Sequence, residues 1–429
     1  MINQTTICAI ATAQGGAIGI IRVSGPGSIS IVDSIFRGRR PLIAAPAYSL
    51  HYGSIVNADV IVDQVLLSLF RAPHSYTGED SVEISAHGSP YILQTICSLL
   101  IQKGCQPAAP GEYTQRAFLN GKLDLTQAEA VADLIASQNA SQHRVAMQQM
   151  RGGISQKLSD LRTQLLKLTS LLELELDFSE EDVEFASRET LINIAREIRD
   201  EITRLSSSFS AGNAIKNGIP VAIIGAPNVG KSTLLNALLH EDKAIVSDIQ
   251  GTTRDTIEDC INISGSLFRI IDTAGLRHTD DVIEQMGIER SRKAAERAQI
   301  IILMRDNDTD YPTIDLRDDQ TVIKVHNKSD HFQALTGKGM DWLEQELLKS
   351  VPTANDDEVL ITNIRHKQAL DTSLLDIQRT LDALEHNLPG DLIAEDLRQC
   401  LHHLAEITGG AIDTEEVLGN IFSHFCIGK

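Results

Sequence analysis

The stretch Ile223–Ser232, which reads IIGAPNVGKS, decides the fold of the central part of this 429-residue chain. Apolar residues typical of a buried strand run into Gly-x-x-x-x-Gly-Lys-Ser, the P-loop pattern, and a helix is expected to follow. Backbone N–H groups of such a loop can wrap a triphosphate, and the positive N-terminus of the helix faces the same anion. Lys231 is expected to reach the β- and γ-phosphates, and the Ser232 hydroxyl to bind Mg²⁺. The stretch therefore predicts nucleotide binding by a P-loop.

Three other segments indicate that the nucleotide carries guanine. Asp272–Gly275 (DTAG) follows a strand-like run, where an Asp can hold Mg²⁺ through water and a Gly amide can sense the γ-phosphate. Asn327–Asp330 (NKSD) follows another apolar run; its Asp can accept from N1–H and the 2-amino group of guanine, and its Lys can cover the base. Ile249–Asp255 (IQGTTRD) places Thr253 as a second hydroxyl on the Mg²⁺ side. An ordinary turn explains any one pattern, but four in this order predict a GTPase module.

The expected nucleotide contacts come from all four motifs. Mg²⁺ is expected at the hydroxyls of Ser232 and Thr253. The residues expected to contact GTP are Asn228, Val229, Gly230, Lys231, Ser232, Thr233, Ser247, Asp248, Ile249, Gln250, Gly251, Thr252, Asp272, Thr273, Ala274, Gly275, Asn327, Lys328 and Asp330.

The catalytic equipment of this module departs from the common pattern. Many GTPases place a Gln after the DTAG-type motif to orient the attacking water, but here Leu276 cannot bond to water. The charge that develops in phosphoryl transfer must then be neutralised by other means. Asn228 offers an oxygen beside the β/γ bridge, and backbone carbonyls between Ser247 and Thr252 can complete a cage for a monovalent cation. The alternative role of Asn228 is to cap the P-loop backbone. Glu284 can reach the reacting phosphate through water, or can be an ordinary surface carboxylate.

Composition places the chain among globular proteins of two to four domains. No apolar run approaches the ~20 residues of a membrane span, and the N-terminus lacks the pattern of a signal peptide. The six cysteines are dispersed without Cys-x-x-Cys, which favours reduced thiols and a cytoplasmic location. The net charge of −20 argues against a broad electrostatic grip on nucleic acid, so RNA binding would need a local basic patch or a partner.

The flanks of the GTPase module predict two further kinds of structure. Residues 1 to about 118 mix strand-like runs, such as Ala17–Val23 and Val60–Leu67, with turns and a helix over Pro90–Leu100, which predicts an α+β domain. From about residue 124 the pattern becomes helical, and it resumes after the GTPase module from Ile364 onward. The GTPase module is therefore expected to be inserted into a helical domain, because closely spaced helix ends tolerate insertions.

Three apolar seams at helical spacing define the helical domain. An acidic break at Asp177–Asp182 is expected to be a solvated turn with a helix cap, with a metal site as the remote alternative, and Ala211–Gly218 is expected to be a linker into the first GTPase strand. The seams are Leu158, Leu161, Leu165, Leu168 and Leu172; Leu191, Ala195, Ile198, Ile202 and Leu205; and Leu370, Leu374, Leu375, Leu381 and Leu384.

The end of the GTPase module is unusually short. Only three residues separate Asp330 from Ala334–Gly337, and they span at most ~11 Å, too little for the helix and strand expected there. Either a segment is missing from the sequence or the chain carries a true deletion. In both cases Ala334-Leu335 is expected to be the remnant of the guanine-contacting loop.

Taken together, these motifs resemble the bacterial tRNA-modification GTPase family MnmE, also called TrmE, almost from end to end. The resemblance rests on Gly15–Gly25 (GGAIGIIRVSG), Tyr76–Asp80 (YTGED), Pro110–Lys122 (PGEYTQRAFLNGK), the GTPase motifs and the terminal Phe425–Lys429 (FCIGK). It implies an N-terminal α+β tetrahydrofolate-binding and dimerisation domain, a split all-α domain and an inserted Ras-like P-loop GTPase domain. The implied bounds are residues 1–119, 120–213 (helical, first part), 214–352 (GTPase) and 353–429 (helical, second part).

The resemblance also implies site residues and cofactors. Arg22, Glu83, Lys122 and Lys429 would contact 5-formyl- or 5,10-methylene-tetrahydrofolate; as chemistry, Arg22 and Lys122 suit the glutamate-tail carboxylates and Glu83 the N–H face of the pterin. It places K⁺ at Asn228, Ser247, Ile249 and Thr252, and Glu284 in γ-phosphate hydrolysis. Cys426 would be a reactive thiol, although such a cysteine can equally be an inert cytosolic one.

The implied activity is a K⁺-stimulated GTPase that forms a homodimer and works with an FAD-binding partner, MnmG (GidA), in a heterotetramer or larger assembly. Together they would modify C5 of the wobble uridine of tRNA with a folate-derived carbon, away from any membrane. The competing hypothesis is a switch of the ribosome-assembly kind, in which GTP gates binding without covalent chemistry. That hypothesis predicts a basic RNA-binding domain, which the sequence does not show.

Overall fold

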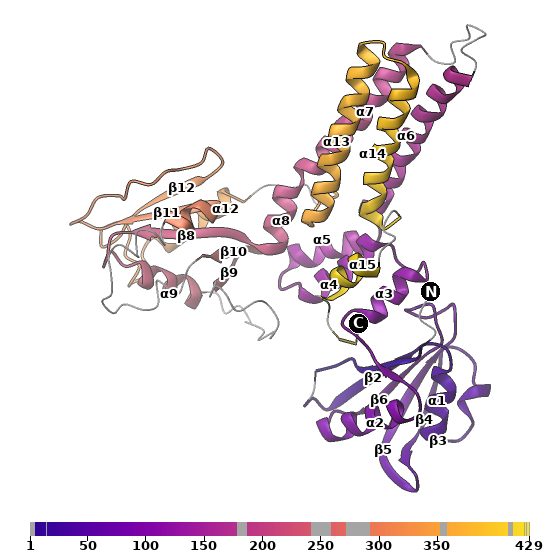
Figure 1. Cartoon of the computed structure of the whole chain (residues 1–429). Coiled ribbons are helices and arrows are strands. Elements are labelled where there is room, and N and C mark those ends of the chain that lie inside the picture. Colours follow the sequence, from indigo (N-terminus) through magenta and orange to yellow (C-terminus); the bar gives the residue numbers. More distant parts are fainter. Residues whose placement is uncertain are drawn as a thin grey trace. The chain divides into compact units, whose positions relative to one another are not determined.

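The computed structural model describes residues 5–13, 15–177, 187–241, 259–271, 292–351, 358–410, 415–423, 425 and 427–428. Its contacts divide the chain into two units (Figure 1). Unit 1 contains residues 1–135, 149–170 and 394–429, and unit 2 contains residues 136–148 and 171–393.

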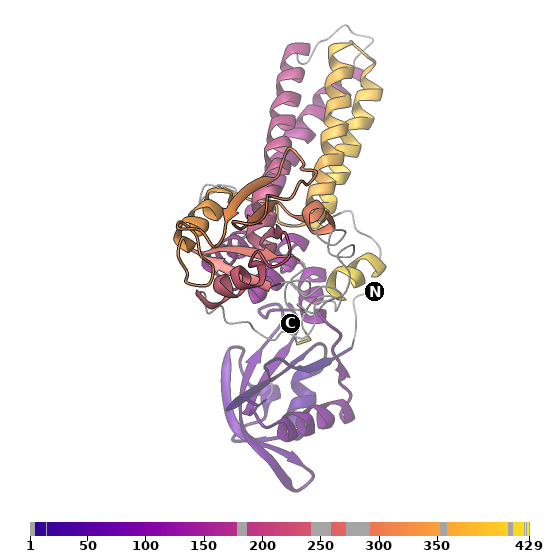
Figure 2. The ribbon, with the colours of Figure 1, turned by 90° about the vertical axis from the view of Figure 1, so that its left-hand side faces the viewer.

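A seven-stranded sheet with the order β3-β4-β5-β6-β2-β1-β7 forms the N-terminal part of unit 1. Neighbouring strands are antiparallel except β1 and β7, which are parallel. Helices α1 (Ser28–Ile35) and α2 (Pro90–Gln102) accompany the sheet, which Figure 2 shows from a second direction. The strands are β1 (Ile7–Ile10), β2 (Ile18–Ser24), β3 (Phe36–Gly38), β4 (Ser49–Asn57), β5 (Val60–Phe70), β6 (Ser81–His87) and β7 (Gln106–Pro107).

Alternation of side chains explains this sheet. In β5 the residues Val65, Leu67 and Leu69 are buried while those between them are more exposed, because successive side chains of a strand point to opposite faces. The buried face joins apolar residues of α2, such as Leu93 and Ile96, in one core. The predicted strands and the helix of the α+β domain are therefore confirmed.

A buried ion network braces the N-terminal part of unit 1. The guanidinium of Arg116, on helix α3 (Glu112–Leu119), donates to Glu112 Oε1 at 2.7 Å and to Glu79 Oε1 at 3.2 Å. Its side chain is only 3% exposed. Each carboxylate thus offsets the cost of burying the charge on Arg116.

Two further helices of unit 1 lie near α3. Helix α4 (Leu125–Ala136) and helix α15 (Glu415–Ser423) share a small core that contains Leu125 and Phe422. Gly111, in the left-handed region at φ +65°, comes so close to α15 that an added Cβ would lie 2.8 Å from the Phe422 carbonyl.

A five-stranded sheet with the order β12-β11-β8-β10-β9 is the centre of unit 2. All neighbouring strands are parallel except β9 and β10. The strands are β8 (Ile219–Gly225), β9 (Asp259–Ile263), β10 (Ser266–Ile270), β11 (Ile300–Arg305) and β12 (Thr321–His326).

Both faces of this sheet are covered, as expected of a parallel sheet. Val221 and Ile223 of β8 join a core with helices α9 (Lys231–Glu241) and α12 (Met340–Lys349). Ala222 and Ile224 join a second core that contains Ala294, Ala295 and Ala298. The continuous apolar run before the P-loop is thus the central strand of an α/β sheet, and the predicted multidomain α+β and α/β fold class is confirmed.

Long helices account for the rest of the described chain. Helix α7 packs along helix α13 within unit 2, where Arg188 Nε donates to the Leu384 carbonyl at 3.1 Å. The helices are α5 (Ala140–Met150), α6 (Gly153–Asp177), α7 (Arg188–Ser207), α8 (Phe209–Asn217), α13 (Ile364–Glu385) and α14 (Gly390–Thr408).

The predicted seams are confirmed on α6 and α7, whose ten seam residues are all buried. On α13 one seam residue was assigned wrongly. Leu375 is 65% exposed, while Ile377 is fully buried in its place, because a neighbouring leucine at i+1 points away from the packed face of a helix.

The predicted linker at Ala211–Gly218 is also wrong. Residues up to Asn217 continue helix α8, and only Gly218 leaves the helix. Gly212 suggested a break, but it marks a close approach: an added Cβ would lie 2.2 Å from the Ile361 carbonyl oxygen. The glycine permits packing here instead of ending the helix.

Several predicted features lie outside the described residues. No described helix has both the length and the apolar character needed to cross a bilayer. The features outside the description are most of the acidic break (residues 178–182), Ser247, Asp248, Ile249, Gln250, Gly251, Thr252, Thr253, Asp272, Thr273, Ala274, Gly275, Leu276, Glu284, Cys426 and Lys429.

Replacing Arg116 by Ala is expected to destabilise the N-terminal sheet of unit 1 by about 3–5 kcal/mol, because two carboxylates would stay buried without their cation. The loss of unfolding free energy is measured by a urea titration, in which hydrogen exchange is followed in peptides that contain β2 and β6. The matched variant Arg37→Ala removes an exposed arginine and should leave exchange unchanged. Equal protection in the two variants would contradict the prediction.

Candidate functional site

The P-loop lies between the end of β8 and the start of α9. Asn228 and Gly230 adopt positive φ angles of 62° and 99°, which turn the backbone of the loop. Lys231 Nζ donates to the carbonyls of Gly225 and Ala226 at 2.8 and 2.9 Å. Burial lowers the pKa of Lys231. Lys231 thus lies over the loop as a half-buried cation, where an anion would relieve its desolvation.

Asn327 ties the P-loop to the segment after β12. Its side-chain Nδ2 donates to the Val229 carbonyl at 2.7 Å, and its Oδ1 accepts from the Ala334 backbone N–H at 3.0 Å. Asn327 is 4% exposed. An added Cβ on Gly230 would lie 2.3 Å from Nδ2, so both this contact and the positive φ require glycine there.

Lys328 reaches back across the same loop. Its Nζ donates to the Asn228 carbonyl at 3.0 Å and pairs with Asp306 Oδ2 at 2.8 Å. The hydrogen bonds from Lys328 and from the Thr309 hydroxyl hold the pKa of Asp306 at about 2. Asp306 therefore holds the Lys328 ammonium group beside the loop.

Asp306 is not among the predicted site residues. It follows the apolar run of β11 directly, at the carboxyl edge where the parallel strands β8, β11 and β12 end together. Ligands of open α/β sheets bind outside this edge. The position of Asp306, directly after a third parallel strand, was therefore the signal that could have predicted its place at the site.

Asn327 and Lys328 bond to the P-loop, and the other predicted nucleotide-site residues that the structure describes lie on the same two segments. Val229 is buried under the loop, Ser232 and Thr233 lie in the first turn of α9, and the Asp330 carboxyl is exposed. The chain runs without interruption from Asp330 to Ala334, with Ser329 N–H donating to the Phe332 carbonyl at 3.1 Å. The short connection between β12 and α12 is thus accommodated by the fold.

A second polar site lies on the N-terminal sheet around Arg22. Arg22 and Glu83 are direct cross-strand partners in β2 and β6, and their side chains pair at 2.8 Å. Arg22 Nη1 donates to the Gly428 carbonyl at 3.1 Å. The rings of Tyr76 and Tyr113 lie 5.7 and 5.6 Å from the guanidinium carbon. This is a cation between two aromatic rings, with an acceptor on each side.

Lys122 follows α3 and contacts the loop between β5 and β6, which carries Tyr76. Its Nζ donates to the Pro73 carbonyl at 3.0 Å, and its stem lies 3.3 Å from where a Cβ on Gly78 would be. The structure therefore brings Arg22 and Glu83 into direct contact, while Lys122 contacts the loop that carries Tyr76 at Pro73. The two tyrosines and Gly428 were not predicted as partners of Arg22, because only the fold brings them there.

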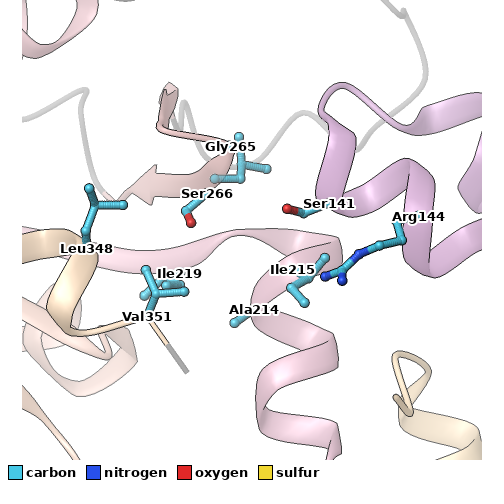
Figure 3. A pocket seen from close by; sticks show the side chains of 10 residues that line it. Ser141, Arg144, Ala214, Ile215, Ile219, Gly265, Ser266, Leu348 and Val351 are labelled. Carbon is cyan, nitrogen blue, oxygen red and sulfur yellow. The ribbon is translucent and has the colours of Figure 1, made fainter. Parts of the chain in front are cut away.

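A pocket of about 240 Å³ lies within unit 2 (Figure 3). Ser141 and Arg144 of α5, Ile215 of α8, Ser266 at the start of β10 and Leu348 of α12 line it, with five further residues. It contains none of the predicted site residues. Among the described residues no group of three or more His, Cys, Asp or Glu side chains is arranged to hold a metal ion.

Comparisons with known proteins agree with this arrangement. The family profile "MnmE helical domain" matches residues 125–426, and "GTP-binding protein TrmE N-terminus" matches residues 6–122. Proteins described as "tRNA modification GTPase MnmE" from Bacteroides thetaiotaomicron and Parabacteroides distasonis are 51% and 54% identical. The first alignment covers all of both chains, and the second covers 99% of this chain and 100% of the relative. A protein of that description from Flavobacterium johnsoniae is 47% identical over the whole of both chains.

These alignments extend over 466, 462 and 467 positions, more than the 429 residues of the chain. The relatives therefore contain residues that this chain lacks.

The fold and the first site define a P-loop nucleotide-binding protein whose α/β sheet interrupts a helical protein. The helical family profile matches residues 125–426, so it includes the segments before and after that sheet. The chain belongs to the MnmE (TrmE) family.

Replacing Gly230 by Ala is expected to weaken GDP binding about 100-fold, because the new Cβ is strained and displaces the Asn327 side chain. Isothermal titration with GDP measures the change. Gly104→Ala is the control, since Gly104 has a similar φ of +111° but an added Cβ there meets nothing within 4 Å. Wild-type affinity in Gly230→Ala would show that the contact with Asn327 does not matter.

Proposed function

We propose that the chain is a K⁺-stimulated GTPase that takes part in tRNA modification. With an FAD-binding partner of the MnmG (GidA) type, it would modify C5 of the wobble uridine, position 34, of certain tRNAs. A 5-formyl- or 5,10-methylene-tetrahydrofolate would supply one carbon, and the product would be of the aminomethyl- or carboxymethylaminomethyl-uridine type. The observation that carries this proposal is the P-loop tied by Asn327 and Lys328 in a chain about half identical to proteins described as tRNA modification GTPases.

The nucleotide chemistry follows from positioning and charge. Lys231 and the first amides of α9 would hold the phosphates, and the Ser232 hydroxyl, with Thr253, would hold Mg²⁺. Asp272–Gly275 and residues 247–252 are proposed to complete the phosphate side. Glu284 is proposed to act on the attacking water, and Cys426 as a reactive thiol.

The side chain of Asn228 supports a cation role over a capping role. Asn228 is exposed, and no described residue bonds to its amide, whereas its carbonyl is held by Lys328. A capping side chain would instead bond to the loop backbone. With Ser247, Ile249 and Thr252, the Asn228 oxygen is proposed to bind K⁺ where its charge neutralises the transition state.

The Arg22 site supports folate binding, but it changes which part of the folate each residue is proposed to contact. Arg22 and Glu83 pair at 2.8 Å, so they cannot contact the pterin and the glutamate tail of one folate molecule, which lie at opposite ends of it. We propose that this pair, flanked by Tyr76 and Tyr113, faces one part of the folate. Lys122 and Lys429 would contact other parts of the folate.

Assembly is the remaining part of the proposal. Leu50, Tyr52 and Leu66 expose 66%, 67% and 42% of their surface on one face of the N-terminal sheet, where Tyr52 and Leu66 are direct partners. Such a patch suits a homodimer interface. The proposed domains are residues 1–119, 120–213, 214–352 and 353–429. Because the chain carries a charge of −20, the MnmG-type partner is proposed to provide much of the contact with tRNA, in the cytoplasm.

Analysis of tRNA nucleosides from a strain that lacks this protein tests the whole proposal. The modified wobble uridine should be absent and should return when the wild-type gene is restored. Unchanged nucleosides would contradict the proposal.

GTP hydrolysis by the wild-type protein is expected to be about tenfold faster in KCl than in NaCl, because the cation stabilises transition-state charge. Asn228→Ala should hydrolyse GTP at one slow rate in both salts while retaining GDP affinity. A phosphate-release assay measures the rates. Equal wild-type rates in KCl and NaCl would remove the cation role of Asn228.

Arg22→Ala is expected to weaken binding of 5-formyltetrahydrofolate about 10- to 100-fold, since charge-assisted hydrogen bonds are lost. Equilibrium dialysis measures this affinity, and Arg37→Ala, which removes an exposed arginine elsewhere on the sheet, is the matched control. GDP binding should not change in either variant. Undiminished folate affinity in Arg22→Ala would refute the assignment.

A further inference from the structure

Two segments of the N-terminal sheet differ from the rest of this acidic chain because they contain no acidic residue. The chain has 58 Asp and Glu residues against 38 Lys and Arg. Residues 34–58, from the end of α1 through β4, and residues 64–78, from β5 into the loop before β6, contain no Asp or Glu. Both segments contain arginine and histidine. They are therefore locally positive although the whole chain is negative.

The two segments meet where β4 begins and β5 ends, on the side of the sheet that ends in β3 (Figure 1). Arg71 directly follows β5, and its Nη2 donates to the carbonyls of Ile43 and Ala45 at 2.7 and 3.0 Å. These bonds tie the segment between β3 and β4 to the end of β5. Arg39 and Arg40 belong to the same segment, and both are exposed. The three arginines thus lie on one ordered stretch of the surface.

The charge of two of these arginines is not neutralised within the described part of the chain. No described acidic side chain forms an ion pair with Arg39 or Arg40. Asp33 and Asp80 bond to the backbone next to the arginines, but each carboxylate accepts from a backbone N–H, at 2.6 and 2.9 Å respectively. The guanidinium groups of Arg39 and Arg40 are therefore available to an anionic ligand.

An exposed aromatic ring follows the arginines on the same segment. Tyr48 is 69% exposed, and its φ of 56° lies in the left-handed region, which a bulky residue rarely adopts. Its N–H donates to the Leu69 carbonyl at 2.8 Å, and its ring meets the Phe70 ring edge to face at 6.0 Å. Residues held in such conformations cluster at functional sites. The strained backbone here keeps a large ring in solvent.

We propose that Arg39, Arg40, Arg71 and Tyr48 form a surface that binds a single-stranded part of tRNA. The arginines contact phosphates, and the Tyr48 ring stacks on an unpaired base. Cations together with an exposed ring suit RNA better than an acidic peptide or a lipid headgroup, because those ligands have no base to stack. This inference rests on the proposed tRNA substrate and deepens it. The MnmG-type partner still provides much of the contact, and this surface adds a local one.

Fluorescence anisotropy of the full chain with an in vitro transcribed tRNA, at several KCl concentrations, measures this binding. Arg39→Gln/Arg40→Gln should weaken binding about tenfold and should reduce the slope of log affinity against log salt by about 1.4, because each lost contact with a single-strand phosphate removes about 0.7. Tyr48→Ala should weaken binding about tenfold without changing the slope, since stacking releases no counterions. Tyr48→Phe should keep the wild-type affinity. A single-stranded oligonucleotide should compete with tRNA better than the same sequence in a duplex.

Arg196→Gln/Arg199→Gln is the matched control, because it changes the net charge by the same amount on α7 and should leave tRNA affinity unchanged. GDP affinity should be the same in every variant, and circular dichroism melting shows that each fold is retained.

If a strain that lacks this protein keeps its modified wobble uridine, the proposed function itself fails. If that uridine is lost, but the wild-type chain binds no tRNA or Arg39→Gln/Arg40→Gln binds it as tightly as the wild type, only the surface is overturned. If heparin binding falls as much as tRNA binding in the arginine variant and Tyr48→Ala has no effect, the surface attracts any polyanion and the assignment to RNA is wrong.

Discussion

The nucleotide part of the protein depends on the two hydrogen bonds of one buried amide. Asn327 donates to the P-loop and accepts from the turn that follows β12, so it satisfies both ends of its side chain at once. If one partner of a buried amide is lost, the donor or acceptor that it leaves unsatisfied carries the full cost of its desolvation. The position of the P-loop and the position of the turn are therefore not independent. Position 230 requires glycine, because the Asn327 side chain occupies the space that a Cβ would need.

The parts of the fold that could be predicted are those with a strong local period. The apolar run before the P-loop and the seams on α6 and α7 are confirmed, because burial of a strand or a helix face leaves a regular pattern in the sequence. The errors concern one close contact between distant segments and the position of one leucine around its helix. Gly212 suggested a break in the helix, but it packs closely against the Ile361 carbonyl. Leu375 was assigned to an apolar seam, but it does not face the core.

The candidate sites show the same division. The P-loop, Asn327 and Lys328 were predicted because their motifs are local, whereas Asp306 was missed because its role depends on β11 ending beside β12. At the second site the residue types were predicted, but their pairing was not. Arg22 and Glu83 are 61 residues apart in sequence, and only the register of β2 against β6 places them opposite each other. That pairing changes their interpretation from two separate ligand contacts to one polar unit.

The bond from Arg22 to the Gly428 carbonyl also has a consequence for the order of folding. It joins residues 406 positions apart, and the whole nucleotide-binding sheet lies between them in the chain. Since domains fold from the N-terminus during synthesis, β2 and β6 can pair long before Gly428 exists. The surroundings of Arg22 then stay incomplete until the P-loop sheet has been made. Synthesis itself thus orders the two sites, with the nucleotide site able to mature first.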